Sequence, residues 1–514
     1  MLRKLPIGIQ TFEKIIDGNY VYIDKTRYIY ELIKSGSVYF LSRPRRFGKS
    51  LLVSTLEAIF KNQSELFKGL WIAESDYEWA EYPVIKISFG GKLYENKQTL
   101  KDYITEIMFK TATSYNVSID HSKPFDSQFR DLIESLEQIN KVVILIDEYD
   151  KPIIDVINNI ELAKANRETL KAFYSVIKEA DPYLRFVFLT GVSKFSKISV
   201  FSGLNNLFDI TMHREYAELL GYTQNELLYY FNDHINKWIL SEQKEKDTLL
   251  SKIQKWYNGY RFSSTDVRVY NPFSILLLMQ TNEFKNYWFE TGTPTFLINL
   301  IKKNDYDIRL FEQLETQEIV FGSYDIEDLR IEALLVQTGY LTIVNYKEED
   351  MLYTLSYPNF EVKNAFLEYL SDTVSGVRRE LAGGYIVRLV NALKQKDLEH
   401  FFEILSIFFA NIPYDIQIKQ ERYYQTIFYL VFTLIGMKVD AEVKTNKGRI
   451  DAVVILNNKI YIFEFKLNGT CEDALAQIKD REYAQKYQNF NKEIILIGVE
   501  FSEQDKNIGR WIAA

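Results

Sequence analysis

The 514-residue sequence contains a single cysteine, Cys471, and only four histidines, which lie far apart. One cysteine excludes an intramolecular disulfide and is typical of proteins in a reducing compartment, so we expect a cytoplasmic protein. The lone cysteine and the scattered histidines also exclude a structural zinc site of the Cys/His kind. Any metal ion is therefore expected to be a hard cation held by carboxylates.

Long apolar runs are missing as well. The N-terminus lacks the continuous apolar segment of a signal peptide. The longest apolar stretch, residues 423–437, includes Gln425 and Thr426 and is too short to span a bilayer, so we expect no membrane association. The net charge of −8 argues against a general polyanion-binding surface and confines any nucleic-acid site to a local patch.

The composition is that of ordinary folded domains, with 47% hydrophobic and 26% charged residues, and the length fits about three of them. The first 215 residues alternate short β-branched runs with amphipathic helices, which predicts an α/β domain with a mainly parallel sheet. A helix is expected from Lys49 to about Phe60. The expected strands are residues 37–42, 82–89, 141–147, 185–191 and 208–211.

The remaining chain predicts two further domains. Residues 216–375 are mostly helical, and the spacing of Thr223 and Glu226 predicts a capping box. Residues 329–370 read as helix, hairpin and helix, an order that resembles a winged helix and serves as often for packing as for reading DNA. The last stretch opens with helices and ends with three strands, a helix and a fourth strand. We therefore expect domains at 1–215, 216–375 and 376–514, the last with its core at 419–514.

Residues 42–50, SRPRRFGKS, lie between a predicted strand and a predicted helix, where a helix N-terminus offers free N–H groups to phosphate. Gly48 would allow close approach of the backbone. Lys49 would reach the β- and γ-phosphates, and Ser50 would ligate Mg²⁺. The full G-x-x-x-x-G-K-S spacing would place its first glycine at position 43, where this chain has Arg43.

An acidic strand end supplies the second part of this pattern. The run KVVILIDEYDKP ends a strand in Asp147 and Glu148, where the aspartate can hold Mg²⁺ through water and the glutamate can activate an attacking water. Thr190, at the end of another buried strand, could contact the γ-phosphate or that water. Arg43, Arg45 and Arg46 could stabilise the transition state or form an exposed basic rim. Together these residues predict ATP and Mg²⁺ binding, while the altered loop leaves hydrolysis open.

Five motifs together resemble the bacterial AAA-ATPase-like family, a P-loop group whose first phosphate-loop glycine is degenerate, so Arg43 fits the family pattern. The resemblance covers roughly residues 4–290. It implies Lys49 and Ser50 as contacts of the nucleotide and Mg²⁺, with Asp147 and Glu148 as the acidic pair. The motifs are IDKT (23–26), SRPRRFGKSLL, IDEYDKP, LTGVSKFSKISVFSGLNNL (189–207) and WYNGYRF…VYNPFS (256–274).

Near the C-terminus, GRIDAVVILNNKIYIFEFKL predicts a β-hairpin. Glu464 and Lys466 share one face of its second strand, while Phe463 and Phe465 face the core. Antiparallel pairing would bring Asp451 opposite the far end of the second strand, close to Glu464 and Lys466. Two carboxylates there can hold one Mg²⁺, and Lys466 can orient a water and stabilise charge on a phosphate. An E-x-K pair on a strand can equally be an ion pair without chemistry.

The order of helix, three strands, helix and strand, with GRID…FEFKL…ALAQIKDREY, resembles the PD-(D/E)XK nuclease superfamily over about residues 419–514. The resemblance implies that Asp451, Glu464 and Lys466 carry the metal and the chemistry, with Gln477 in support and Glu421 as an extra ligand. Residues 421–514 hold 13 basic and 13 acidic side chains, so this module has no basic surplus.

These two sites predict an ATP-binding and ATP-hydrolysing protein that controls a Mg²⁺-dependent nuclease acting on nucleic acid, with DNA favoured over RNA. The alternative is a nucleotide-dependent switch or scaffold whose nuclease-like domain binds without cleaving. P-loop ATPases often complete their sites with an arginine from a neighbouring copy, so a homo-oligomer also stays open.

Overall fold

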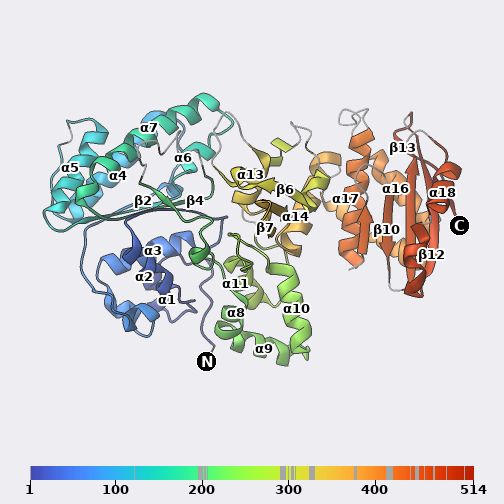
Figure 1. The fold of residues 1–514 in the computed structure, drawn as a ribbon, viewed down its shortest axis with the longest axis horizontal. Coiled ribbons are helices and arrows are strands. Elements are labelled where there is room, and N and C mark those ends of the chain that lie inside the picture. The colour runs from blue at the N-terminus through green and yellow to red at the C-terminus, as the bar shows by residue number, and fades with distance from the viewer. Residues whose placement is uncertain are drawn as a thin grey trace. The chain divides into compact units, whose positions relative to one another are not determined.

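The computed structural model divides into two compact units, Met1–Leu297 with Gln313–Glu361, and Ile298–Glu312 with Val362–Ala514 (Figure 1). No helix within the described ranges combines the length and the apolar character that a bilayer crossing needs. The structure describes residues 2–120, 122–194, 201, 204, 206–289, 297–298, 300–301, 306, 308–322, 330–375, 379–411, 421–439, 442–445, 451–456, 458–466, 469–481, 483–502 and 504–514.

The first unit is built around a five-stranded parallel sheet with the strand order β2-β3-β4-β1-β5. Every residue of β1 and β3 is buried, as expected of a parallel sheet that is covered on both faces. Each strand overlaps a segment predicted from the sequence, with β4 beginning one residue earlier than predicted, so the predicted α/β fold is confirmed. The strands are β1 (Val38–Ser42), β2 (Val84–Ser88), β3 (Val142–Asp147), β4 (Leu184–Gly191) and β5 (Phe208–Asp209).

Helices cover both faces of this sheet, with α1, α2 and α3 on one side and α4, α5 and α7 on the other (Figure 1). Helix α3 begins at Lys49 and ends at Phe60, as the sequence predicts. The helices are α1 (Phe12–Asp17), α2 (Thr26–Ser35), α3 (Lys49–Phe60), α4 (Lys97–Ser114), α5 (Phe125–Glu137), α6 (Lys151–Ile154) and α7 (Ile160–Glu179).

The rest of the first unit is helical apart from a small antiparallel sheet. Thr223 and Glu226 form the predicted capping box at the start of α8. The predicted hairpin is formed by β7 (Thr342–Lys347) and β8 (Leu352–Ser356), and a further strand, β6 (Leu314–Gln317), pairs with β8. The helices here are α8 (Gln224–Tyr230), α9 (Asn232–Glu242), α10 (Lys246–Tyr257), α11 (Pro272–Thr281) and α13 (Ile331–Thr338).

The second unit holds a mixed sheet with the order β13-β12-β11-β10-β9, in which only β11 and β12 run parallel. Helices α16 and α17 contact the sheet from the side opposite α18 (Figure 1). The elements are α14 (Phe360–Ser375), α15 (Arg379–Gln395), α16 (Leu398–Ala410), α17 (Glu421–Val439), β9 (Glu442–Thr445), β10 (Asp451–Ile455), β11 (Lys459–Lys466), α18 (Cys471–Asp480), β12 (Glu493–Ser502) and β13 (Asn507–Ala513).

The side chains of β11 alternate between these two helical layers. Phe463 packs against Phe432 of α17, with ring centroids 4.9 Å apart, and Phe465 packs against Phe428 at 4.3 Å. The intervening residues face α18, where Ile462 joins a small apolar cluster. The prediction that Phe463 and Phe465 face the core, opposite Glu464, is therefore confirmed.

Candidate functional site

The phosphate loop, residues 43–48, folds around the ammonium group of Lys49. Nζ of Lys49 donates hydrogen bonds to the carbonyl oxygens of Arg43 and Pro44, at 2.9 and 3.0 Å. Burial lowers the pKa of Lys49 to about 8, against the pull of nearby carboxylates. Gly48 has a φ of 93°, in the left-handed region that favours glycine, and it places the first amides of α3 at the end of the loop.

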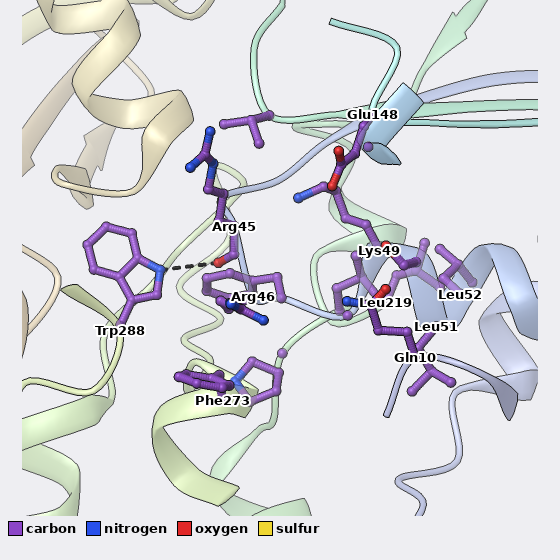
Figure 2. A pocket seen from close by; sticks show the side chains of 18 of the residues that line it. Gln10, Arg45, Arg46, Lys49, Leu51, Leu52, Glu148, Leu219, Phe273 and Trp288 are labelled. Carbon is purple, nitrogen blue, oxygen red and sulfur yellow. Dashed lines mark hydrogen bonds between the residues drawn. The ribbon is translucent and has the colours of Figure 1, made fainter. Parts of the chain in front are cut away.

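The loop borders a cavity of about 770 Å³ in the first unit. This volume lies within the range of small-ligand pockets, about 300–1,000 Å³. Figure 2 shows the side chains of Lys49 and Glu148 pointing toward each other at this cavity. The predicted site residues that line it are Arg45, Arg46, Gly48, Lys49, Ser50 and Glu148.

The acidic pair lies where β3 ends. Asp147 is buried, and its Oδ1 accepts the backbone N–H of Glu148 at 2.9 Å. Glu148 has a φ of 53° and lies against Gly90, where a Cβ atom would come within 2.6 Å of Glu148 Oε2. Burial, reinforced by the charge of Asp147, raises the pKa of Glu148. A carboxylate with a raised pKa beside Lys49 is well suited to accept a proton.

Arg43, which replaces the first glycine of the motif, is buried and is not among the residues that line the cavity, so the prediction of an exposed rim is wrong for this arginine. Its buried guanidinium donates to the carbonyl oxygens of Ser42, Thr211 and Tyr216 at 3.0, 2.6 and 3.3 Å. It also lies 4.2 Å from the ring centre of Phe262. Arg43 therefore stabilises the loop through hydrogen bonds made outside the cavity.

The two exposed arginines of the loop border the cavity. The guanidinium of Arg46 lies over the ring of Phe273 at 4.8 Å. The carbonyl oxygen of Arg45 accepts a hydrogen bond from Nε1 of Trp288 at 3.1 Å (Figure 2). Trp288 was not predicted, because it lies more than 240 residues away from this loop along the chain.

Thr190 lies at the end of β4, as predicted, but its hydroxyl donates to the carbonyl oxygen of Leu41 at 2.8 Å, and it is not among the residues that line the cavity. Its contact with phosphate stays a prediction. Asp150 does line the cavity, and its carboxylate accepts the N–H groups of Val192 and Ser193 at 3.1 and 2.6 Å. Burial raises its pKa. The only sequence signal for Asp150 was a further carboxylate in IDEYDKP.

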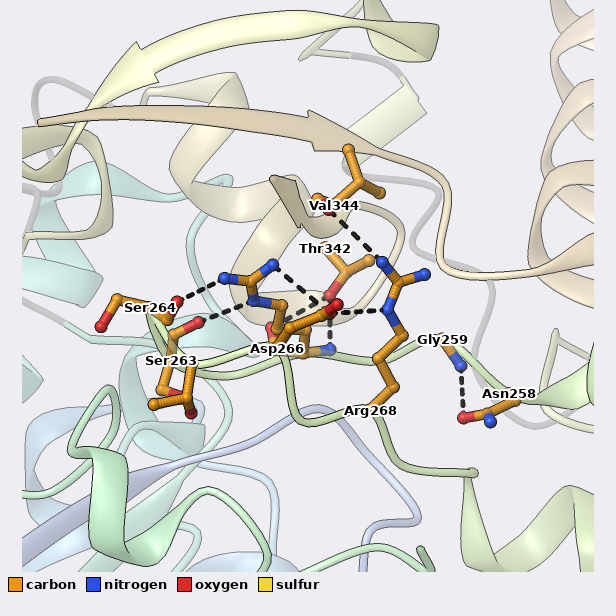
Figure 3. A network of polar contacts seen from close by, with 10 residues as sticks. Asn258, Gly259, Ser263, Ser264, Asp266, Arg268, Thr342 and Val344 are labelled. Atoms are coloured by element: carbon orange, nitrogen blue, oxygen red, sulfur yellow. Dashed lines mark hydrogen bonds and ion pairs between the residues drawn. The ribbon is translucent and has the colours of Figure 1, made fainter. Parts of the chain in front are cut away.

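The WYNGYRF segment links the phosphate loop to β7. Tyr260 and Phe262 pack edge-on against Phe47, with ring centroids 4.8 and 5.3 Å away. Between them, Arg261 exchanges hydrogen bonds with the hydroxyl of Thr342, which accepts from the Arg261 N–H at 2.8 Å and donates to its carbonyl at 3.0 Å (Figure 3). The segment therefore supports the loop, and none of residues 256–262 lines the cavity.

In the second unit, the register of β10 and β11 places Asp451 opposite Glu464. Glu464 is buried and Lys466 is partly exposed, with Lys466 Nζ 3.7 Å from Glu464 Oε1. The side-chain amide of Gln477 joins them, because it donates to Glu464 Oε1 and accepts from Lys466 Nζ. The side chains of Asp451 and Glu421 lie outside the described residues.

Helix α18 positions Gln477 over β11. It begins with a capping box formed by Thr470 and Asp473. It approaches β12 so closely at Gly498 that a Cβ atom there would lie 2.2 Å from the carbonyl oxygen of Cys471. The thiol of Cys471 is buried, which raises its pKa, as expected of an unreactive cysteine.

A carboxylate pair with a neighbouring lysine has the oxygen ligands that a hard divalent cation takes. Glu464 supplies one such carboxylate, and the backbone register places Asp451 opposite it. Among the side chains that the structure describes, no three His, Cys, Asp or Glu residues form a preassembled metal cluster.

Comparison with known proteins gives two family matches. Residues 6–201 match the family described as "Predicted AAA-ATPase", and residues 419–511 match the PD-(D/E)XK nuclease superfamily. Both predicted resemblances are confirmed. The first match ends before the WYNGYRF and VYNPFS motifs, which the sequence had included up to about residue 290. The "Uncharacterized protein in vnfD 5'region" of Azotobacter chroococcum mcd 1 is 39% identical over 524 residues, covering 98% of each chain.

Proposed function

Because this chain joins a domain of the predicted AAA-ATPase family to a domain of the PD-(D/E)XK nuclease superfamily, we propose that it uses ATP to control Mg²⁺-dependent cleavage of nucleic acid. The observation that carries this proposal is that one chain holds both a lysine seated in a phosphate loop and a Glu464–Gln477–Lys466 network opposite Asp451. Either arrangement alone would support only half of this function.

At the first site, each residue has a defined role. Lys49 would exchange its two carbonyl partners for the β- and γ-phosphates, and the first amides of α3 would bind phosphate oxygens. Ser50 and Asp147 would hold Mg²⁺, which neutralises charge on the phosphates when bound. Glu148 would orient the attacking water and take its proton, a role that its raised pKa supports.

At the second site, Glu464 and Asp451 would hold Mg²⁺, which supplies a polarised phosphoryl oxygen and an activated water when bound. Lys466 would orient that water and stabilise negative charge on the phosphate. Gln477 would keep Glu464 and Lys466 at their present separation of 3.7 Å. The substrate is a nucleic acid, with DNA favoured over RNA.

The proposal is tested on the purified full chain. Isothermal titration measures ATP binding in Mg²⁺ by the wild type and by Lys49→Ala. Linear, circular and single-stranded DNA and RNA are then incubated with Mg²⁺ and ATP. We expect Lys49→Ala to abolish ATP binding, and EDTA or Lys466→Ala to abolish cleavage. Lys459→Ala, at the opposite end of β11, is the matched control and should cleave normally. Intact substrates throughout would contradict the nuclease assignment.

A second candidate function is favoured by the contact between Lys466 and Glu464, because an ion pair on a strand can be purely structural. In that case the C-terminal domain would bind nucleic acid or a partner under nucleotide control without cleaving. Nucleic-acid binding by a wild type that cleaves nothing, unchanged in Lys466→Ala, would support this second function.

A further inference from the structure

The three arginines of the phosphate loop have guanidinium groups in different surroundings. The guanidinium of Arg43 is buried and donates to three backbone carbonyl groups. The guanidinium of Arg46 lies over the ring of Phe273 at 4.8 Å. Arg45 is exposed, and its side chain makes no hydrogen bond, ion pair or ring contact with any residue that the structure describes. Of these three arginines, Arg45 is therefore the one whose charge is available to a ligand.

The backbone that carries Arg45 is held in place by Trp288. Nε1 of Trp288 donates to the carbonyl oxygen of Arg45 at 3.1 Å, and the Trp288 ring packs against that of Tyr340, with ring centroids 5.1 Å apart. Gly339 lies between these segments, because a Cβ atom there would be 2.8 Å from Cβ of Pro44 and 3.3 Å from the Trp288 ring. A fixed backbone with an unpaired charged side chain is suited to contact a ligand at the cavity.

Arg45 lies on the side of the loop where the outer phosphates belong. Arg45, Lys49 and Glu148 all line the cavity, and in Figure 2 the amino group of Lys49 lies between the side chains of Arg45 and Glu148. Burial lowers the pKa of Lys49 to about 8, and the charge of Arg45 acts in the same direction. A lysine at this position of the motif contacts the β- and γ-phosphates, so the guanidinium of Arg45 is near the terminal phosphate.

On the basis of the proposed ATP-binding function, we propose that Arg45 is a catalytic residue for ATP hydrolysis and acts in cis, on the nucleotide bound by its own chain. In this reaction a water attacks the terminal phosphorus and gives a proton to Glu148. The bond between that phosphorus and the β–γ bridging oxygen breaks, which leaves ADP and inorganic phosphate. Arg45 donates hydrogen bonds to the bridging and terminal oxygens, where negative charge grows in the transition state.

This assignment distinguishes Arg45 from its neighbour in the loop. Arg46 also borders the cavity, but its guanidinium lies over Phe273 of α11 and would have to leave that ring to reach a phosphate. Trp288 is then a positioning residue, since it holds the peptide of Arg45 and not its charge. An arginine supplied by the phosphate loop itself means that hydrolysis needs no arginine from a neighbouring copy, so the rate per chain should not depend on protein concentration.

The test measures ATP hydrolysis and ligand affinity with the purified full chain in Mg²⁺. We expect Arg45→Ala to lower kcat at least about a hundredfold and to keep the Kd for ATP within about fivefold of the wild-type value. ADP with aluminium fluoride, which resembles the transition state, should lose affinity by a much larger factor than ATP. Arg46→Ala should lower kcat far less. Arg27→Ala, an exposed arginine of α2 that does not line the cavity, is the matched control.

A mixture of two variants distinguishes action in cis from action in trans. Lys49→Ala keeps Arg45 but lacks the lysine that binds the phosphates, whereas Arg45→Ala has the opposite defect. We expect an equimolar mixture to hydrolyse ATP no faster than the sum of the two variants measured separately. Recovery of hydrolysis in the mixture would show that Arg45 acts on a neighbouring copy and would overturn the assignment in cis.

The outcomes separate this inference from the proposed function. A kcat near the wild-type value in Arg45→Ala, an equal loss of affinity for ATP and for the aluminium fluoride complex, or a wild type that binds ATP without hydrolysing it would each overturn the role of Arg45. Lys49-dependent ATP binding would stand in all three cases. A wild type that does not bind ATP, or a Lys49→Ala variant that binds it equally well, would overturn both.

Discussion

Asp451 at the start of β10 lies directly opposite Glu464 on β11, two residues before Lys466. Carboxylates at such facing positions have Cβ atoms about 4.5–5.5 Å apart, a separation that a single divalent cation can bridge. This pairing is the place where we propose that the C-terminal domain binds Mg²⁺. Gln477 of α18 forms hydrogen bonds with both Glu464 and Lys466, so the arrangement of these two charged groups depends on one neutral side chain.

Gln477→Leu removes the amide that joins Glu464 to Lys466 while keeping a side chain of similar size. We expect the cleavage rate to fall at least tenfold and the Mg²⁺ concentration for half-maximal cleavage to rise, because both groups lose the contact that orients them. A Mg²⁺ titration of the cleavage rate measures both. Lys479→Ala, on an exposed face of α18, is the control. Unchanged Mg²⁺ dependence in Gln477→Leu would contradict the bridging role.

Replacing Arg43 by the glycine of the standard phosphate-loop motif should destabilise the protein. Arg43→Gly removes a buried guanidinium that donates to three carbonyl groups, so we expect the free energy of unfolding of the first unit to fall by about 2–4 kcal/mol. Denaturant unfolding measures this loss. The transition that belongs to the first unit is identified as the one that ATP moves to higher denaturant concentration. The exposed Arg46→Gly should cost far less. A more stable or tighter-binding Arg43→Gly would refute the bracing role.

ATP affinity should depend on pH through Lys49. Its pKa of about 8 in the free chain means that the amine loses its charge as the pH rises through 8. Phosphate binding requires the charged form, so affinity is full below pH 8 and falls toward tenfold per pH unit above it. Anisotropy of a labelled ATP in EDTA, between about pH 6.5 and 9.5, measures this. Lys49→Arg should make ATP affinity nearly independent of pH over this range. A wild-type affinity that does not change with pH would contradict the role of the Lys49 charge.

Trp288 should report nucleotide binding. Its indole donates to the carbonyl oxygen of Arg45 and contacts the ring of Tyr340 at 5.1 Å. Bound phosphates should draw Lys49 away from the carbonyl oxygens of Arg43 and Pro44. The adjacent Arg45 carbonyl should then shift and change the fluorescence emission of the Trp288 indole. We expect ATP to change tryptophan fluorescence in the wild type and in Trp71→Phe, an exposed tryptophan. Trp288→Phe should lose most of the change; retention of the full change would exclude Trp288 as the reporter.

The sequence predicted the elements whose signals are local. The five strands of the first sheet are marked by apolar runs, and Lys49 begins α3 because a glycine precedes it. The hairpin turn was enough to place Asp451 near Glu464 and Lys466, and the structure pairs it with Glu464. The strands β6 and β13 were missed because they are sheet-edge strands with many polar or half-exposed residues.

Contacts between distant segments could not be predicted. The end of β4 contacts the phosphate loop, through the bond from Arg43 N–H to the carbonyl oxygen of Gly191, only because β4 lies beside β1. Strand order is not readable from a single sequence. Gln337 and Trp288 come from segments more than 140 and 240 residues from their partners, Lys194 and Arg45. Thr190 ends its strand as predicted, yet its hydroxyl is paired within the sheet, a detail of register that residue types do not reveal.

The most direct test of the central claim is the initial rate of DNA cleavage by the full chain in Mg²⁺, measured with and without ATP, for the wild type and Lys49→Ala. The account predicts that ATP changes the cleavage rate of the wild type and leaves the rate of Lys49→Ala unchanged. Lys466→Ala should cleave neither with nor without ATP. A wild-type rate that is identical with and without saturating ATP would contradict nucleotide control of the nuclease.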